Sequence, residues 1–323
     1  MSNLETEPAE VVLTESSPAT VEVLDFREVP LGGPRAMPVR RTLPQRARSL
    51  VGAWCFVDHY GPDPVTGPGA MTVPPHPHTG LQTVSWLFAG EIEHRDSVGS
   101  HALIEPGQLN LMTAGAGIQH SEVSTDRSSE LHGAQLWIAL PDAHRAVAPF
   151  FESYVPHPVA VGDATLRVFL GSLAGQTSTA TTFTELVGAQ LDLPAGGRVE
   201  LPVDPRFEHA LLVDAGAPTL QNVAIAQNQL GVAPVGADTL VVEAGDEPLR
   251  ALLIGGVPLG ERIVMWWNFV GRSHDEVVAF REQWQHEVIA GADAAGRFGG
   301  IPEYPGSPLP APELPNVRLQ PRD

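Results

Sequence analysis

The sequence predicts an all-β fold of two tandem antiparallel barrels or jelly rolls, with one short C-terminal helix. Three observations support this prediction. The chain of 323 residues contains 32 glycines and 31 prolines, which suit tight turns between strands. Short runs of β-favouring residues lie between these turns. The same succession of strands and turns occurs twice, and a chain of this length can form two domains of ordinary size.

Four segments are expected in order along the chain. They are a disordered N-terminus over residues 1–20, a first barrel over 21–145, a second barrel over 146–270, and a helix with a Pro-rich tail over 271–323. The first barrel begins with an extended arm over residues 22–44. The tail, rich in proline from residue 299 onward, is expected to be extended along a surface or disordered.

Strands of the first barrel are marked by their turns. Residues 83–88 (TVSWLF) form a β-rich run that ends at Ala89-Gly90, and residues 91–96 continue as the next strand. After the corner Pro106-Gly107, residues 108–113 alternate between apolar and polar side chains as a half-buried strand does. Both patterns predict antiparallel strands joined by short turns.

The second barrel repeats this pattern after a Pro- and His-bearing connection over residues 144–158. Its predicted strands are Leu186 to Leu193, Arg198 to Leu201, His209 to Val213, Thr239 to Glu243 and Arg250 to Ile254. Turn residues such as those of 194–197 (PAGG) separate them. Closed barrels or jelly rolls leave few strand edges open, which makes two such units the simplest arrangement.

One helix is predicted near the C-terminus. Ser273 and Glu276 have the spacing of a capping box, in which each side chain satisfies a backbone N–H at the helix start. Apolar residues then recur at helical spacing: Val277, Phe280, Trp284 and Val288. We expect this helix to pack on a barrel as a structural element.

Charge and composition exclude several classes of partner. The chain has 19 Lys and Arg against 38 Asp and Glu, so its net charge of -19 repels nucleic acid and anionic lipid surfaces. No run of about 18 apolar residues could span a membrane, and the acidic N-terminus does not resemble a secretory signal. Cys55 is the only cysteine, which excludes an intrachain disulfide. A cytoplasmic protein is expected.

Two histidines are two residues apart in the stretch PPHPHTG, where the prolines exclude a helix. Residues i and i+2 of a strand point to one face, about 6.5–7 Å apart, so His76 and His78 can bind one metal ion. With 12 histidines in the chain, a His-x-His pair occurs by chance with a probability of roughly a third. The pair therefore needs further ligands to indicate a site.

Three pairs combine a histidine with an acidic residue at i+2. His274 and Glu276 lie on the predicted helix, where positions i and i+2 diverge. His94 and Asp96 lie within EIEHRDS, which is typical of a charged ladder on a sheet. His120 and Glu122 follow the small-residue turn TAGAG, which allows close backbone approach and directs the next strand inward. This last pair is the preferred candidate.

The stretches PHPHTGLQTVSWLFAGEIEHRDSVG and IEPGQLNLMTAGAGIQHSE together resemble the two metal-binding motifs of pirins, which are bicupins of the cupin superfamily. The resemblance covers residues 58–122. It implies that both barrels are cupin domains, and that His76, His78, His120 and Glu122 bind one divalent metal in the first barrel. The metal is usually iron in this family.

From chemistry alone, three imidazoles and a carboxylate suit Fe, Cu, Mn, Ni or Zn equally. The chain departs from the family pattern at Gln82, where cupins commonly carry a glutamate. The second barrel resembles a degenerate cupin motif, with His209 lacking a His-x-His companion, and is expected to hold no metal.

The resemblance implies a quercetin 2,3-dioxygenase activity, in which a small phenolic or enolisable molecule reacts with O2 at the metal. Glu122 would act as the general base that takes the substrate's hydroxyl proton. One alternative is a non-catalytic iron-binding regulator that senses redox state and acts through a protein partner. Another is a metal that only stabilises the barrel.

Overall fold

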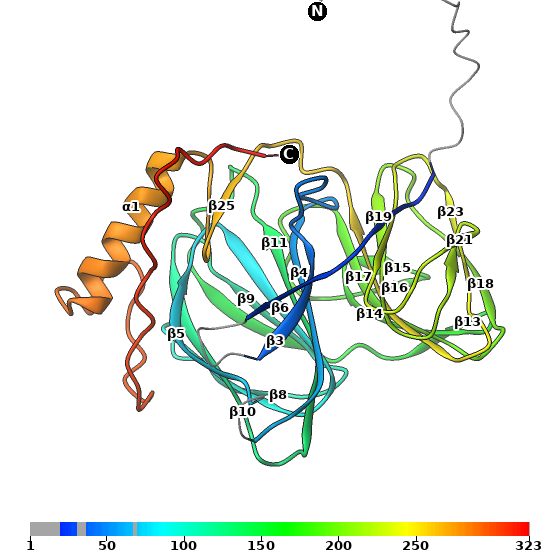
Figure 1. The fold of residues 1–323 in the computed structure, drawn as a ribbon, viewed down its shortest axis with the longest axis horizontal. Helices are drawn as coiled ribbons and strands as arrows, with labels where there is room; N and C mark the ends of the chain where they lie inside the picture. The colour runs from blue at the N-terminus through cyan, green and yellow to red at the C-terminus, as the bar shows by residue number, and fades with distance from the viewer. Residues whose placement is uncertain (1–19, 31–36, 67–69, 323) are drawn as a thin grey trace, which may run out of the picture.

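The computed structural model describes residues 20–30, 37–66 and 70–322, and it confirms an all-β chain with a C-terminal helix (Figure 1). The expected disordered N-terminus, residues 1–20, lies outside these residues except for Thr20. Among the helices of the described ranges, none is long and apolar enough to cross a membrane.

The first unit consists of two antiparallel sheets that face each other as a jelly-roll barrel (Figure 1). The strand order is β12-β9-β6-β11-β4-β3-β2 in the larger sheet and β5-β10-β7-β8 in the smaller one. The bounds are β2 (Arg27–Pro30), β3 (Pro38–Leu43), β4 (Trp54–Pro64), β5 (Thr72–His78), β6 (Leu81–Ala89), β7 (Ile92–Asp96), β8 (His101–Ile104), β9 (Leu109–Thr113), β10 (Ile118–Ser124), β11 (Glu130–Ala139) and β12 (Phe150–Tyr154).

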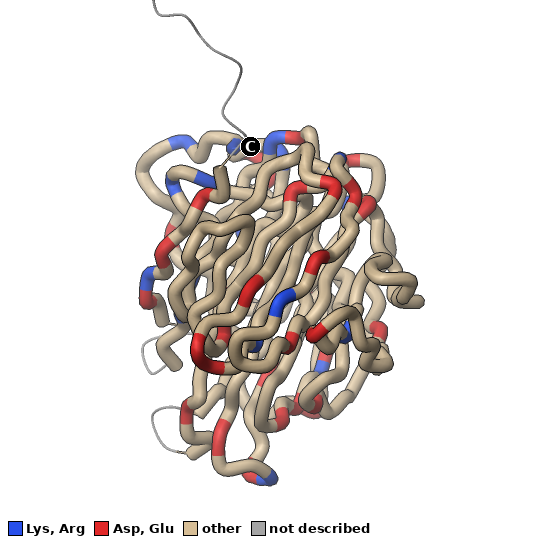
Figure 2. The backbone as a smooth tube through the Cα atoms, turned by 90° about the vertical axis from the view of Figure 1, so that its right-hand side faces the viewer, with Lys and Arg blue, Asp and Glu red and all other residues tan. Residues whose placement is uncertain are grey.

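The second unit has the same plan. Its sheets have the orders β1-β22-β19-β24-β17-β14-β13 and β18-β23-β20-β21, beside a two-stranded β15-β16 ladder. The bounds are β1 (Glu22–Leu24), β13 (Val159–Val161), β14 (Ala164–Leu170), β15 (Ser172–Leu173), β16 (Gln176–Thr177), β17 (Leu186–Leu193), β18 (Arg198–Pro202), β19 (Glu208–Ala215), β20 (Thr219–Leu220), β21 (Val223–Ala224), β22 (Leu230–Ala233), β23 (Thr239–Glu243) and β24 (Leu249–Gly256). Acidic positions are spread over its strands and loops, with few basic positions between them (Figure 2).

Two strands belong to a different unit from the one that their sequence position suggests. β1 follows the N-terminus but pairs with β22 of the second unit, Glu22 lying opposite Val232. β12 lies beyond residue 145 but pairs with β9 of the first unit, Phe150 lying opposite Thr113. The expected division at residue 145 therefore does not coincide with sheet membership. Local patterns do not show this exchange, because long-range pairing decides it.

The two larger sheets pack face to face through a shared core. Trp86 on β6 is fully buried and stacks on Phe169 of β14, with ring centroids 4.5 Å apart. Its indole Nε1 donates a hydrogen bond to Gln190 Oε1 at 2.9 Å, which satisfies the buried polar atom. β6 is buried on both faces because the barrel interior lies on one side and the second unit on the other.

The C-terminal segment packs on the outside of the first unit. After the β25-β26 ladder (Val264–Trp266 and Phe269–Gly271), helix α1 (His274–Trp284) continues into the short π-helical turn η2 (Gln285–Ile289). Ser273 Oγ accepts a hydrogen bond from the Glu276 backbone N–H, as predicted, and the Glu276 carboxylate accepts from the Arg272 backbone N–H. The tail then runs beside the helix toward the C-terminus (Figure 1).

Candidate metal centre

His76 and His78 lie on β5, at the edge of the smaller sheet of the first unit. Prolines have no backbone N–H to donate to a ladder, so an edge strand is where a Pro-rich sequence such as VPPHPH can be accommodated. β5 pairs with β10, and His76 is directly opposite His120. A register shift between His120 and Glu122 marks a bulge, which turns the end of β10 locally.

The three histidines point to a common centre, and all three are buried. His78 Nε2 and His120 Nε2 are 3.0 Å apart, and the His76 ring centroid lies 4.4 Å from that of His120. Two metal–nitrogen bonds of about 2.1 Å at a right angle would place their nitrogens about 3.0 Å apart. The arrangement therefore fits a single ion with imidazoles in neighbouring positions.

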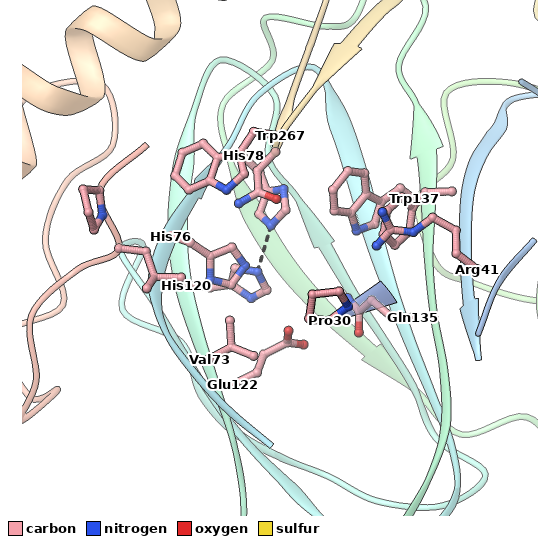
Figure 3. A pocket seen from close by; sticks show the side chains of 14 residues that line it. Pro30, Arg41, Val73, His76, His78, His120, Glu122, Gln135, Trp137 and Trp267 are labelled. Atoms are coloured by element: carbon pink, nitrogen blue, oxygen red, sulfur yellow. Dashed lines mark hydrogen bonds between the residues drawn. The ribbon is translucent and has the colours of Figure 1, made fainter. Parts of the chain in front are cut away.

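Glu122 supplies a carboxylate at the same centre. Ligand atoms of His94, His120 and Glu122 lie within 4.8 Å of one another, as do those of His76, His78 and His120. Glu122 Oε1 accepts a hydrogen bond from Ser85 Oγ at 3.3 Å. Figure 3 shows Glu122 directly below the histidines. All four residues that the sequence singled out line one cavity, and His120 is common to both groups of ligand atoms.

Burial controls the protonation of these groups. It lowers the pKa of His76 to about 4 and the pKa values of His78 and His120 well below 6.5. Neutral imidazole is the form that binds a metal, so no proton has to leave these rings at neutral pH. Burial also raises the pKa of Glu122, an effect that His94 and Ser85 partly oppose. A carboxylate with a raised pKa is a stronger proton acceptor.

A cavity of about 550 Å³ opens from this centre, which is within the usual range for small-molecule sites. Arg41, Gln135 and Trp137 lie on another side of the cavity from Glu122 (Figure 3), and Phe56 also lines it. Phe56 and Trp137 are stacked with ring centroids 4.0 Å apart, and the Arg41 guanidinium lies 4.2 Å from the Phe56 centroid. The wall therefore offers aromatic surface and a cationic group.

Residues far apart in the chain complete the cavity. Pro30 comes from β2, Trp267 and Asn268 from the loop between β25 and β26, and Leu309 and Pro310 from the tail. The Leu309 backbone N–H donates to Pro75 O at 2.8 Å, so the tail is fixed directly beside the metal-binding strand. No pattern in the sequence indicated these wall residues, because each lies in a segment without a motif.

His94 and Asp96 do not form the surface ladder that their sequence suggested. Both side chains are buried, and His94 Nδ1 lies 3.4 Å from His120 Nδ1. The signal that could have found them is the i, i+2 spacing on a strand adjacent to β10, but strand pairing is not visible in a single sequence. The pair therefore belongs to the surroundings of the metal centre.

Gln82, the departure from the family pattern, contacts a different part of the molecule. Its Nε2 donates to Thr113 Oγ1 at 2.9 Å and to Thr181 O at 3.0 Å. Among the described residues, no hydrogen bond joins Gln82 to the four candidate ligands. It links the first unit to the segment between β16 and β17 instead.

A second cluster of buried titratable groups lies between the two units. Asp214 Oδ1 is 2.8 Å from His59 Nε2 and 2.6 Å from His132 Nε2, and Arg250 Nε donates to Asp214 Oδ2 at 2.5 Å. The guanidinium already neutralises the carboxylate, which makes this cluster a hydrogen-bonded link between the units. His209 lies on the same strand as Asp214 and is buried. Its Nδ1 has no hydrogen-bond partner among the described residues.

Comparison with known proteins agrees with this geometry. The family model "Pirin" matches residues 36–138, and "Pirin C-terminal cupin domain" matches residues 188–289. A Pseudomonas aeruginosa protein named "Putative quercetin 2,3-dioxygenase" is 40% identical over 291 residues, which is 90% of this chain and 89% of that protein. A pirin-like protein from Caulobacter vibrioides is 34% identical over 292 residues, 87% of this chain and 99% of that protein.

Solved structures show the same similarity. A crystal structure of quercetin 2,3-dioxygenase from Acinetobacter baumannii has a TM-score of 0.85 and 37% identity, and covers 93% of this chain and 98% of that one. A bacterial pirin from Escherichia coli in complex with nickel(II) has a TM-score of 0.57 and 17% identity, with 74% of this chain and 99% of that one covered. At that identity the second comparison shows the fold alone.

Proposed function

Because the chain belongs to the pirin family of bicupins, we propose that it is a metal-dependent dioxygenase of the quercetin 2,3-dioxygenase type. His76, His78, His120 and Glu122 would hold one divalent transition metal. The substrate would be a flavonol or a related enolisable phenol that reacts with O2. The observation that carries the proposal is that these four side chains line one cavity of about 550 Å³, with His120 within ligand distance of both the other histidines and Glu122.

Iron(II) is the metal that we propose, because it is the usual metal of the family to which the chain belongs, and imidazole with carboxylate suits it. Copper, manganese and nickel fit the same donors, and zinc fits them without redox chemistry. When bound, the metal would polarise the substrate's oxygens and supply the redox-active centre for O2.

The remaining steps fall to the protein's own side chains. Glu122 would take the proton of the substrate hydroxyl, since burial raises the pKa of its carboxyl group. Ser85 Oγ lies 3.3 Å from Glu122 Oε1 and 3.0 Å from Gln135 Oε1, so its single proton can be donated to the carboxylate in competition with the Gln135 amide oxygen. Removal of the hydroxyl proton would leave an electron-rich enolate, the form of the substrate that can react with O2.

The cavity walls would bind and orient the aromatic substrate. Trp137 offers a ring 5.1 Å from that of His78, so a flat molecule at the metal would lie against it. Arg41 would donate a hydrogen bond to an oxygen at the far end of the molecule. Leu309 and Pro310 from the tail would exclude water from one side.

The test is the metal content of protein purified without oxygen, followed by oxygen uptake after quercetin is added. We expect a stoichiometric redox-active metal and O2 consumption that Glu122→Gln abolishes while most of the metal stays bound. Glu130→Gln is the matched control, because Glu130 is exposed on β11. A filled metal site with no oxygen uptake on any phenolic substrate would overturn the catalytic proposal and favour a regulator that acts through a protein partner.

A further inference from the structure

We propose that His94 and Asp96 are positioning residues that fix the proton of His120 on Nδ1, so that the Nε2 lone pair faces the metal. The inference rests on the proposed role of His120 as a ligand. It assigns a role to two buried side chains that take no part in the chemistry described above.

Strand pairing places His94 and Asp96 on the strand next to that of His120. β10 and β7 are antiparallel neighbours, with His120 opposite Asp96 and Glu122 opposite His94. His94 and Asp96 are two residues apart on β7 and therefore share a face. The His94 ring is held by stacking on Phe151 of β12, with centroids 4.7 Å apart and planes at 26°.

Asp96 determines the direction of the hydrogen bonds. Its Oδ1 accepts the backbone N–H groups of Val98 at 3.0 Å and Ser100 at 2.9 Å, in the turn after β7. Its Oδ2 lies 3.1 Å from His94 Nε2. A carboxylate that accepts from this many donors acts as an acceptor toward His94 as well, so the His94 proton lies on Nε2.

The position of the proton on His94 determines which nitrogen of His120 carries its proton. With its proton on Nε2, the His94 ring presents a lone pair on Nδ1, which is 3.4 Å from His120 Nδ1. His120 Nδ1 must carry the proton that fills this contact, and at 3.4 Å the bond is longer than an ordinary N–H hydrogen bond. His120 Nε2 is thereby left without a proton, 3.0 Å from His78 Nε2.

The proton of His76 is also fixed on Nδ1, by a different acceptor. Its Nδ1 lies 2.9 Å from Pro74 O, which can only accept, so the proton is on Nδ1 and Nε2 is free. Metal-binding histidines commonly donate their second N–H to a carbonyl or carboxylate in this way. For His120 the acceptor is a neighbouring imidazole backed by a carboxylate.

A direct ligand role for His94 is the competing interpretation, since its ring is close to those of His120 and Glu122. Two observations favour the positioning role. The His94 nitrogen faces Nδ1 of His120, whereas Nε2 of His120 faces His78. His94 is also absent from the residues that line the cavity, whereas all four proposed ligands line it.

The experiment measures copper(II) affinity by chelator competition in the full-length protein, with copper EPR to report the number of nitrogen donors. We expect Asp96→Asn and His94→Phe to weaken copper binding about 10- to 100-fold without changing the number of nitrogen donors. His94→Gln should recover part of the affinity, because its amide oxygen can accept from His120 Nδ1. Glu93→Gln, a neighbour on the outer face of β7, is the control.

Asp96 also accepts two backbone N–H groups, so Asp96→Asn can disturb the turn. His94→Phe keeps the ring on Phe151 and the turn intact, and thermal unfolding of the metal-free variants verifies that they fold. Wild-type copper affinity in His94→Phe would overturn the inference, and loss of one nitrogen donor would show His94 to be a ligand. Wild-type protein that binds no copper would overturn both the inference and the metal site on which it rests.

Discussion

Arg41 and Asp58 form two parallel hydrogen bonds across β3 and β4, with Nε–Oδ1 at 2.6 Å and Nη2–Oδ2 at 2.7 Å. The Asp58 carboxylate is fully buried, while the Arg41 side chain is 21% exposed. Among the described residues, no acceptor is recorded for Arg41 Nη1. The ion pair therefore fixes a guanidinium in the cavity wall and leaves one of its nitrogens available to a ligand.

Replacement of Arg41 should affect folding and ligand binding in different proportions. Arg41→Met leaves a buried carboxylate without a partner, which should lower the free energy of unfolding by about 3–5 kcal/mol. Arg41→Lys keeps the charge but loses the paired geometry, and should cost less stability while still raising KM for quercetin. Urea unfolding and oxygen-uptake kinetics measure the two effects. Arg198→Met, at an exposed pair, is the control and should change neither.

Trp137 should contribute to substrate affinity through its ring. Trp137→Leu removes the ring against which a flat substrate would lie, and such aromatic contacts are worth about 0.5–1.5 kcal/mol. We expect KM for quercetin to rise about 2- to 13-fold with the metal content unchanged. Steady-state oxygen uptake measures KM, and an unchanged KM would remove Trp137 from the substrate wall.

His209 should make the stability of the protein depend on pH. Burial lowers the pKa of His209 to about 4, an effect that Asp204 partly opposes. Because the folded pKa lies below the unfolded value of 6.5, the contribution of neutral His209 is complete above pH 6.5 and is lost as the pH falls toward 4. The change in the pKa of His209 from 6.5 to about 4 corresponds to about 3 kcal/mol in the free energy of unfolding.

The measurement is urea unfolding at several pH values between 7 and 4. His209→Gln should flatten the pH dependence, whereas His101→Gln, at a half-exposed position, should leave it unchanged. If the free energy of unfolding changes with pH by the same amount in wild type and in His209→Gln, His209 does not cause the pH dependence.

Asp214 should contribute to the link between the two units. Burial raises the pKa of Asp214, but hydrogen bonds from His132 and His59 outweigh this effect and hold it well below 3.8. Its contribution is therefore present above pH 3.8 and lost as the pH falls below that value. Asp214→Asn should lower the free energy of unfolding at pH 7 by about 3 kcal/mol. The difference in the free energy of unfolding between Asp214→Asn and wild type, measured by urea unfolding, should become smaller below pH 4.

Removal of the tail should open the metal centre. A chain that ends at residue 306 loses the Leu309 N–H bond to Pro75 O and the bond from Trp284 Nε1 to Leu309 O at 2.9 Å. We expect faster release of the metal to a chelator and a higher KM for quercetin. A chain that ends at residue 314 keeps Leu309 and Pro310 and is the matched control. Identical release rates in both truncated forms would contradict a role for the tail at the site.

The local part of the structure could be predicted from the sequence. The strand over Thr239–Glu243 and the cap at Ser273 depend on neighbouring residues, and both were found where the pattern indicated. The convergence of His76 with His120 followed from motifs whose spacing reflects strand geometry.

Features that depend on distant pairing could not be predicted in this way. The membership of β1 in the second unit, the contact between His94 and His120, and the place of Leu309 in the cavity wall all join segments that lie far apart. Hydrophobic periodicity reports which face of a strand is buried, but not which strand lies beside it.

The cavity wall combines Pro30, which precedes the metal-binding strands in the sequence, with Leu309, which follows the whole second unit. Access to the metal centre therefore depends on segments that lie far from the ligands along the chain. An insertion or deletion that displaces either segment would alter the enclosure of the centre without changing any ligand.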